Sequence, residues 1–237
     1  MKKKNRIILI FTLLIFSSLA LSACSSPYQT KSEDVSGFNR ISIETFGEFI
    51  IDQGEEESLT IEAPRDYLRY ITTEVKNRTL IISTRRGFIG GPVRRATFTI
   101  TVKDLEDISL SGAGAIKVFA LETDTLDINL TGAGSIEIDE LTADRLEVNL
   151  DSAGAIIIAG TVEKQDINLT GVGSYEGGDL QSEDSEIYLT GAGSAVVWAE
   201  DDLDVEITGV GSVSYFGNPD VYQDISGLGS INSKGAH

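Results

Sequence analysis

Side chains that could perform chemistry are unevenly represented in this sequence. It holds one cysteine, Cys24, and one histidine, His237. Neither a zinc site made of several such residues nor a histidine-based catalytic triad can be built from one of each. Carboxylates are abundant, because 37 Asp and Glu oppose 19 Lys and Arg, for a formal net charge of −18. That charge repels phosphate backbones, so we expect no nucleic-acid partner. We also expect no cofactor.

Six carboxylates recur at a fixed place in the second half of the chain. Each lies five residues before a recurrent small residue, and they are Asp107, Asp127, Glu147, Asp166, Glu186 and Asp204. On stacked strands they would form an outward ladder with a spacing of about 4.8 Å. The ladder could recruit Ca²⁺ or a cationic peptide. The simpler interpretation is a solvated column that mainly prevents aggregation.

A basic segment at residues 85–95 is the second candidate site. Four arginines flank two bulky apolar residues there: Arg85, Arg86, Phe88, Ile89, Arg94 and Arg95. An exposed loop of this kind suits an anionic lipid, a wall polymer or the acidic patch of a partner. Alternatively, it is a surface turn whose Phe88 and Ile89 fold back onto the core.

A repeat of 18 to 20 residues must position the ladder. A four-residue signature begins at residues 111, 131, 151, 170, 190, 208 and 226, mostly as Thr or Ser, Gly, a small residue and Gly. Its second glycines are Gly114, Gly134, Gly154, Gly173, Gly193, Gly211 and Gly229. We interpret each as a corner that needs a positive φ or a close approach between coils, with the residue before it pointing into the bend. Ser152 replaces the first glycine once, which suggests that the first glycine is the less constrained of the two.

Apolar residues alternate with polar ones on both sides of each corner. Leu110, Leu130, Leu150 and Leu169 share one place in the repeat, and Ile108, Ile128, Val148 and Ile167 lie two residues earlier. A period of two is typical of strands with one face inward, and a fixed repeat of such units is typical of solenoids. The sequence therefore predicts an all-β protein: a parallel β-helix of about seven coils over residues 104–237.

Residues 37–103 lack the signature and are predicted to form a β region that caps the N-terminal end of the solenoid. Strands are expected at residues 38–43, 48–53, 58–62, 80–83 and 97–103, with a short helical or irregular piece at residues 67–74. Three asparagines at equivalent places, Asn129, Asn149 and Asn168, are expected to hydrogen-bond to one another along the stack.

The N-terminus has the pattern of a bacterial export signal. A basic start precedes an apolar stretch from residue 7 to residue 21, and the segment ends in Leu-Ser-Ala-Cys. That ending resembles a lipobox, which implies cleavage after residue 23 and lipidation of Cys24. Ordinary secretion with an incidental cysteine is the alternative. We therefore expect a signal peptide at residues 1–23, a flexible polar tether at residues 24–36, and a protein anchored to the bacterial cell envelope through lipid.

The ordered combination of motifs also resembles a known family. The run F-G-E-F-I-I-D-Q-G, then S-L-T-I-E-A, V-K-N-R-T-L-I-I-S and the series of corner signatures is similar to the putative auto-transporter adhesin, head GIN domain family. The likeness extends over about residues 38–232. It implies a β-helical envelope protein, often a lipoprotein, and it brings no catalytic residues.

Our functional expectation is a non-enzymatic, lipid-anchored, adhesin-like scaffold. Its partners would be the membrane through the anchor and an envelope polysaccharide, a wall polymer or another surface protein. One alternative is a stress-related lipoprotein that sequesters cationic peptides on its acidic face. The other is a polysaccharide-processing β-helix enzyme, which would need carboxylates clustered with a basic residue in a cleft. Only Lys117, Arg145, Lys164 and Lys234 are basic after residue 103, so catalysis is the weaker alternative.

Overall fold

The computed structural model of the protein describes residues 27–85 and 96–237. Two segments lie outside the described residues. They are residues 1–26, with the predicted export signal and Cys24, and residues 86–95, with Arg86, Phe88, Ile89, Arg94 and Arg95. The predictions made for these segments therefore remain predictions.

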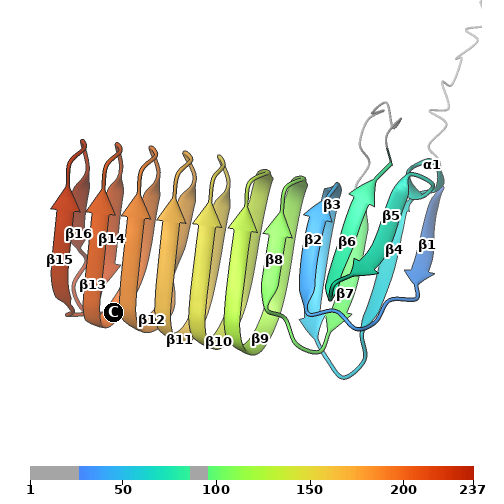
Figure 1. Ribbon diagram of the computed structural model, residues 1–237, viewed down its shortest axis with the longest axis horizontal. Coiled ribbons are helices and arrows are strands. Elements are labelled where there is room, and N and C mark those ends of the chain that lie inside the picture. The colour runs from blue at the N-terminus through green and yellow to red at the C-terminus, as the bar shows by residue number, and fades with distance from the viewer. Residues whose placement is uncertain (1–26, 86–95) are drawn as a thin grey trace, which may run out of the picture.

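The repeat half forms a parallel β-solenoid, as predicted (Figure 1). Its long bent strands are β9 (Ala113–Leu130), β10 (Ala133–Leu150), β11 (Ala155–Leu169), β12 (Ser174–Leu189) and β13 (Ser194–Ile207). Leu130, Leu150 and Leu169 are aligned in register on β9, β10 and β11. The next coil is divided into β14 (Ser212–Phe216) and β15 (Asp220–Ile225), and β16 (Ser230–Ser233) stacks on β14 one position further along.

Each bent strand contributes one limb to each of two facing sheets. The limb that ends at the corner signature, such as residues 126–130, belongs to what we call the front sheet, together with β8 (Asp107–Leu110) and β15. The limb that follows the corner belongs to the back sheet, together with β14 and β16. The strand therefore turns twice per coil, once at the glycine corner and once at the bend at the opposite edge (Figure 1).

Residues 37–103 supply two further rungs as well as the cap. β2 (Arg40–Glu44) lies between β8 and β6 (Thr79–Thr84) in the front sheet, in parallel with both. β3 (Phe46–Gln53) lies between β9 and β7 (Thr97–Val102) in the back sheet, again in parallel. Phe46 and Gly47 pair with Ala113 and Gly114, so the stretch from Thr45 to Gly47 is a corner that its sequence does not reveal.

Antiparallel strands end the solenoid on this side. β5 (Ile71–Lys76) covers the edge of β6, and β4 (Ser58–Pro64) covers the edge of β7, with the one-turn helix α1 (Arg65–Leu68) between them. β1 (Tyr28–Glu33) then pairs with β4. The prediction of a flexible tether over residues 24–36 is therefore wrong for Tyr28–Glu33. Its side chains are almost all exposed, so backbone hydrogen bonds to the free edge of β4 hold it.

The core is the inward row of aliphatic side chains that runs the length of the solenoid. Leu110, Leu130, Leu150, Leu169 and Leu189 are all at most 2% exposed. Each such residue contributes about 1.5–3 kcal/mol through burial. The stack is therefore stabilised without any disulfide.

Close backbone approach, rather than a positive φ, explains the corner glycines. None of the seven predicted glycines has a positive φ. A Cβ on Gly134 would lie 1.9 Å from the carbonyl oxygen of Gly114, and a Cβ on Gly114 would lie 2.0 Å from that of Gly47. Adjacent coils thus pass too close at the corner to admit a side chain.

Two finer predictions about the corner are wrong. The residues between the glycines point to solvent, because the corner folds around backbone: Val172 is 63% exposed and Leu228 is 82% exposed. The first glycine is as constrained as the second, since a Cβ on Gly132 would lie 2.0 Å from the oxygen of Gly112. Ser152 fits because the corner opens there: Val172 and Ala192 donate their N–H groups to the previous corner, whereas no such bond from Ala153 occurs among the described residues.

Candidate binding surface

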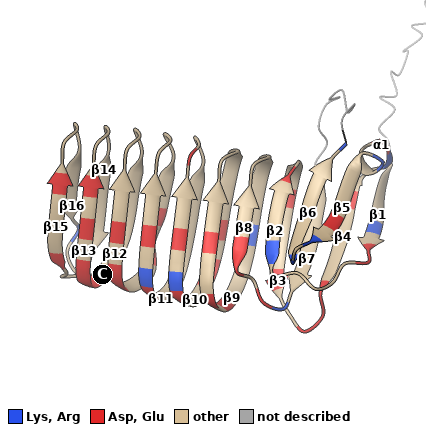
Figure 2. Cartoon of the chain, in the orientation of Figure 1, with Lys and Arg blue, Asp and Glu red and all other residues tan. Residues whose placement is uncertain are grey.

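The six ladder carboxylates lie in one register on the front sheet. Asp127 pairs with Asp107 and Glu147, Asp166 pairs with Glu147 and Glu186, and Glu186 pairs with Asp204. Figure 2 shows them as a band of acidic residues across successive strands. Parallel pairing without a slip brings them together, because a shift of one residue would turn each side chain inward.

Different residues occupy the ladder position beyond its two ends. Arg40 of β2 is in register with Asp107, and Tyr222 of β15 is in register with Asp204. The Arg40 guanidinium also lies 3.8 Å from the carboxylate of Glu106. The carboxylates are therefore bounded by a cation on the side of the cap and by an exposed phenol on the other side.

The N-terminal end of the ladder holds carboxylates that resist ionisation. Partial burial, followed by the charge of Asp127, raises the pKa of Asp107 above its ordinary value. Partial burial, followed by the charge of Glu147, raises the pKa of Asp127. Arg40 opposes both shifts. A nearby cation would stabilise the ionised form of these carboxylates, so this end of the ladder favours a cationic ligand.

Two cations neutralise the middle of the ladder. Arg145 donates a hydrogen bond to Asp166 Oδ2, and Lys164 Nζ lies 3.6 Å from Asp166 Oδ1. Lys164 Nζ also lies 2.5 Å from Glu186 Oε1. The unneutralised carboxylates therefore fall into two groups, one near the cap and one near the last rung.

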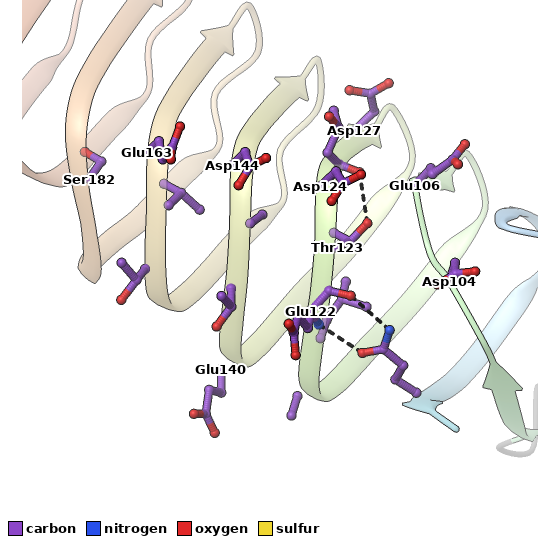
Figure 3. A pocket seen from close by; sticks show the side chains of 18 of the residues that line it. Asp104, Glu106, Glu122, Thr123, Asp124, Asp127, Glu140, Asp144, Glu163 and Ser182 are labelled. Atoms are coloured by element: carbon purple, nitrogen blue, oxygen red, sulfur yellow. Dashed lines mark hydrogen bonds between the residues drawn. The ribbon is translucent and has the colours of Figure 1, made fainter. Parts of the chain in front are cut away.

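A second acidic column, which the sequence interpretation missed, follows the bend of the solenoid. Its members lie three residues before those of the ladder and are all exposed: Asp104, Asp124, Asp144, Glu163, Glu183 and Asp201. The signal was present in the sequence as an acid-x-x-acid spacing that recurs once per coil. Figure 3 shows Asp124, Asp144 and Glu163 on successive coils, with Asp104 beside them.

The bend column borders a groove of about 1750 Å³. Gln53 from β3 holds its wall, because Gln53 Nε2 donates to the carbonyl oxygens of Lys103 and Glu122 and Gln53 Oε1 accepts from the Glu122 N–H, each at 2.9 Å. Among the charged side chains of the lining, carboxylates predominate, and the basic ones are Arg40 and Lys103. The acids of the groove shown in Figure 3 come from several successive coils. This arrangement suits reversible binding of an extended cation better than proton transfer at one point.

The other predicted sites stand as follows. The predicted asparagine row is joined by a bond of 3.3 Å from Asn149 Nδ2 to Asn129 Oδ1, and Asn168 follows in register. Of the basic loop, only Arg85 is described, and it is exposed, with its N–H donating to the Tyr70 carbonyl.

Over residues 27–85 and 96–237, no group of three or more His, Cys, Asp or Glu is arranged to hold a metal ion. No helix in the same ranges has the length and apolarity to cross a membrane.

Comparison with known proteins agrees with this architecture. The family model of the putative auto-transporter adhesin, head GIN domain, matches residues 37–219. The crystal structure of a putative adhesin from Bacteroides fragilis is 30% identical, with a TM-score of 0.86, over 88% of this chain and 98% of that chain. No curated protein sequence matches.

Two further crystal structures, both from Parabacteroides distasonis, show the same fold at lower identity. One is a putative adhesin, 22% identical with a TM-score of 0.71 over 88% of this chain and 97% of that one. The other is a putative lipid binding protein, 23% identical with a TM-score of 0.69 over 87% and 96%. With the matched model and the Bacteroides structure, the chain belongs to the putative auto-transporter adhesin, head GIN domain family.

Proposed function

We propose that the protein is a non-enzymatic, lipid-anchored scaffold of the cell envelope that binds cationic polymers, such as basic peptides, along its bend groove. The supporting observation is the in-register acidic ladder from Asp107 to Asp204 on the front sheet, together with the exposed acids that recur once per coil from Asp104 to Asp201 at the bend. A rigid solenoid holds these carboxylates at the spacing of its strands. An extended polycation can therefore contact several of them with little ordering of the protein.

Neutralising the bend column in the groove tests the ligand. Asp124, Asp144 and Glu163 are exposed and line the groove. In the full-length chain in detergent, Asp124→Asn, Asp144→Asn and Glu163→Gln together should weaken polylysine binding by roughly tenfold, and the binding should weaken steeply with salt. The matched control neutralises three exposed carboxylates of the cap region, Glu48, Glu62 and Glu74, with the same change in net charge. Equal losses in the two triple variants would show that only net charge matters and would reject the groove.

The anchor is tested separately. Cys24 is the only cysteine, and it closes the Leu-Ser-Ala-Cys segment. Cys24→Ser should therefore abolish both the incorporation of labelled fatty acid and the release of the mature chain by lipoprotein processing. Adding Ser25→Cys to this variant should restore neither the labelling nor the processing. Unchanged labelling of the Cys24→Ser protein would reject lipid anchoring and leave the groove untouched.

The family name supports an adhesive role for such a scaffold. Adhesion would then depend on the same acidic surface meeting a basic partner on another cell or polymer. The lipid binding named for the Parabacteroides protein is less suited to this chain, because carboxylates far outnumber basic side chains in the described groove and repel anionic headgroups.

A further inference from the structure

The two ends of the solenoid are finished differently. At the cap, Tyr67 and Ile71 are 5% and 6% exposed, and antiparallel strands cover the outermost parallel rung. At the other end, the inward residues Val221 and Ile225 of β15 are 37% and 38% exposed. All six residues of β15 are exposed, although the inward side chains one rung earlier, such as Leu203 and Ile207, are fully buried. Among the described residues, the last rung has no covering layer.

β15 also offers a free hydrogen-bonding edge. It pairs with β13 along one side, and no described strand pairs with its other side. The N–H of Ser226 donates to the Ile207 carbonyl at 3.0 Å. Because the groups of a parallel strand alternate in direction, Val221, Gln223 and Ile225 present their N–H and C=O groups to the free edge. An extended chain can add to such an edge through its own backbone.

The outward side chains around this edge define the charge of a partner. Asp220 and Asp224 of β15 stand beside Asp202 and Glu206 of β13, with Asp204 between the latter two. None of these five carboxylates forms an ion pair within the described parts of the chain. A second copy of this edge would place like charges opposite each other, which disfavours a symmetric dimer. A basic segment would meet opposite charges instead.

We propose that the free edge of β15 binds an extended peptide segment in which basic and apolar residues alternate. Its backbone pairs with Val221, Gln223 and Ile225. Its basic side chains lie on the front sheet beside Asp220 and Asp224, on either side of the exposed Tyr222. Its apolar side chains cover Val221 and Ile225 and so close the open end of the core. The inference shares with the proposed function only a cationic partner, and it uses a different surface.

Two short peptides of equal composition test the pattern. The probe is Lys-Ile-Lys-Thr-Lys-Ile-Lys, and the control groups the same residues as Lys-Lys-Lys-Lys-Ile-Ile-Thr, both measured by fluorescence anisotropy with the full-length chain in detergent. The alternating peptide should bind roughly tenfold more tightly or better, because only it can place its charges and its apolar groups on opposite faces. Equal affinities would overturn the inference.

A backbone variant tests the edge itself. Gln223→Pro removes an N–H that faces the free edge and leaves the bonds between β13 and β15 in place, as edge strands tolerate. Gln223→Pro should weaken binding of the alternating peptide by about tenfold or more. Gln223→Thr keeps the N–H and should leave binding unchanged. The thermal unfolding curve of Gln223→Pro establishes that the protein is folded. Unchanged binding by a folded Gln223→Pro protein would overturn the inference.

Two further comparisons separate the possible failures. The groove triple variant at Asp124, Asp144 and Glu163 should still bind the alternating peptide. A loss of binding in that variant, with none in Gln223→Pro, would overturn the edge while leaving the proposed function standing. Sedimentation measures whether the protein self-associates. If the wild-type chain self-associates and the Gln223→Pro variant is monomeric, a second copy occupies the edge, and the proposal of a basic partner is likewise overturned.

Discussion

The hydroxyl of Tyr175 donates a hydrogen bond of 2.8 Å to Gln165 Oε1 inside the solenoid. Both residues are fully buried, and burial raises the pKa of Tyr175 well above its ordinary value, so the phenol stays protonated and serves as a donor. Gln165 Nε2 in turn donates to the hydroxyls of Ser182 at 2.9 Å and Ser185 at 3.0 Å. A polar network thus replaces aliphatic packing in this part of the core.

Replacing Gln165, which accepts the hydrogen bond from Tyr175, should lower the stability of the fold even though a leucine fits at this position. Leu146 occupies the equivalent inward position one rung earlier. Gln165→Leu should nevertheless lower the free energy of unfolding by about 1–3 kcal/mol, because the Tyr175 hydroxyl loses its partner. Urea unfolding measures the effect. Adding Tyr175→Phe should recover part of the loss, and full additivity of the two changes would contradict the network.

The backbone contacts at the corners lead to a second prediction. A Cβ on Gly134 would lie 1.9 Å from the Gly114 oxygen, far inside van der Waals contact, so Gly134→Ala must force two coils apart. We expect a loss of about 3 kcal/mol or more in the free energy of unfolding, or failure to fold. Gly178→Ala is the control: the nearest atom to its Cβ would be Val196 Cγ1 at 3.2 Å, and the cost should be about 1 kcal/mol or less. Similar costs for both variants would contradict close backbone approach as the reason for glycine at the corner.

Repetition made the solenoid predictable. The period-two rows around Leu130 and Leu150 and the fixed spacing of the ladder specify both the inward face and the register, which together place Asp127 beside Glu147. The bend column was overlooked because exposed acids such as Asp124 at a turn look like ordinary solvated residues. A recurrence at one position per coil was the signal that distinguished them.

The cap was less predictable because it lacks repetition. Phe46 takes a corner position that is small elsewhere, so nothing local relates Thr45 to Gly112. The antiparallel strand β5 falls partly in a segment expected to be helical or irregular, since only the neighbouring edge of β6 selects its conformation. β1 depends in the same way on the edge of β4. Pairings with distant partners leave no pattern in the strand itself.

The raised pKa values of Asp107 and Asp127 predict a pH dependence of stability. Because the folded pKa lies above that of the unfolded chain, the folded state binds these protons more readily, and ionisation disfavours folding. Asp107→Asn should therefore raise the melting temperature at pH 7. The gain should shrink as the pH falls through the raised pKa of Asp107, because the wild-type carboxyl then becomes protonated as well. Asp124→Asn, on the exposed bend of the next coil, should show neither effect, and a pH-independent gain in Asp107→Asn would contradict the assignment.

Asp166 makes the ladder's ion pairs testable, because it is the ladder residue most removed from water. Its side chain is 10% exposed, and its Oδ1 has no hydrogen bond, only Lys164 Nζ at 3.6 Å. Arg145→Met removes the hydrogen bond to Oδ2, leaving a largely buried carboxylate with one distant cation. Since Arg145 itself is about half exposed, solvent screens the pair, and we expect a loss of about 1–2 kcal/mol in the free energy of unfolding.

The rescue decides whether that loss comes from charge. Asp166→Asn in the Arg145→Met background should restore most of the stability, because the amide removes the unpaired charge while keeping the shape of the side chain. Lys117→Met is the matched control on the back sheet, where Lys117 pairs with the exposed Glu137 and Asp139, and it should change stability by about 0.5 kcal/mol or less. If Asp166→Asn restores nothing, the contribution of Arg145 lies in the packing of its aliphatic stem, and the middle of the ladder is held together by contact rather than by charge.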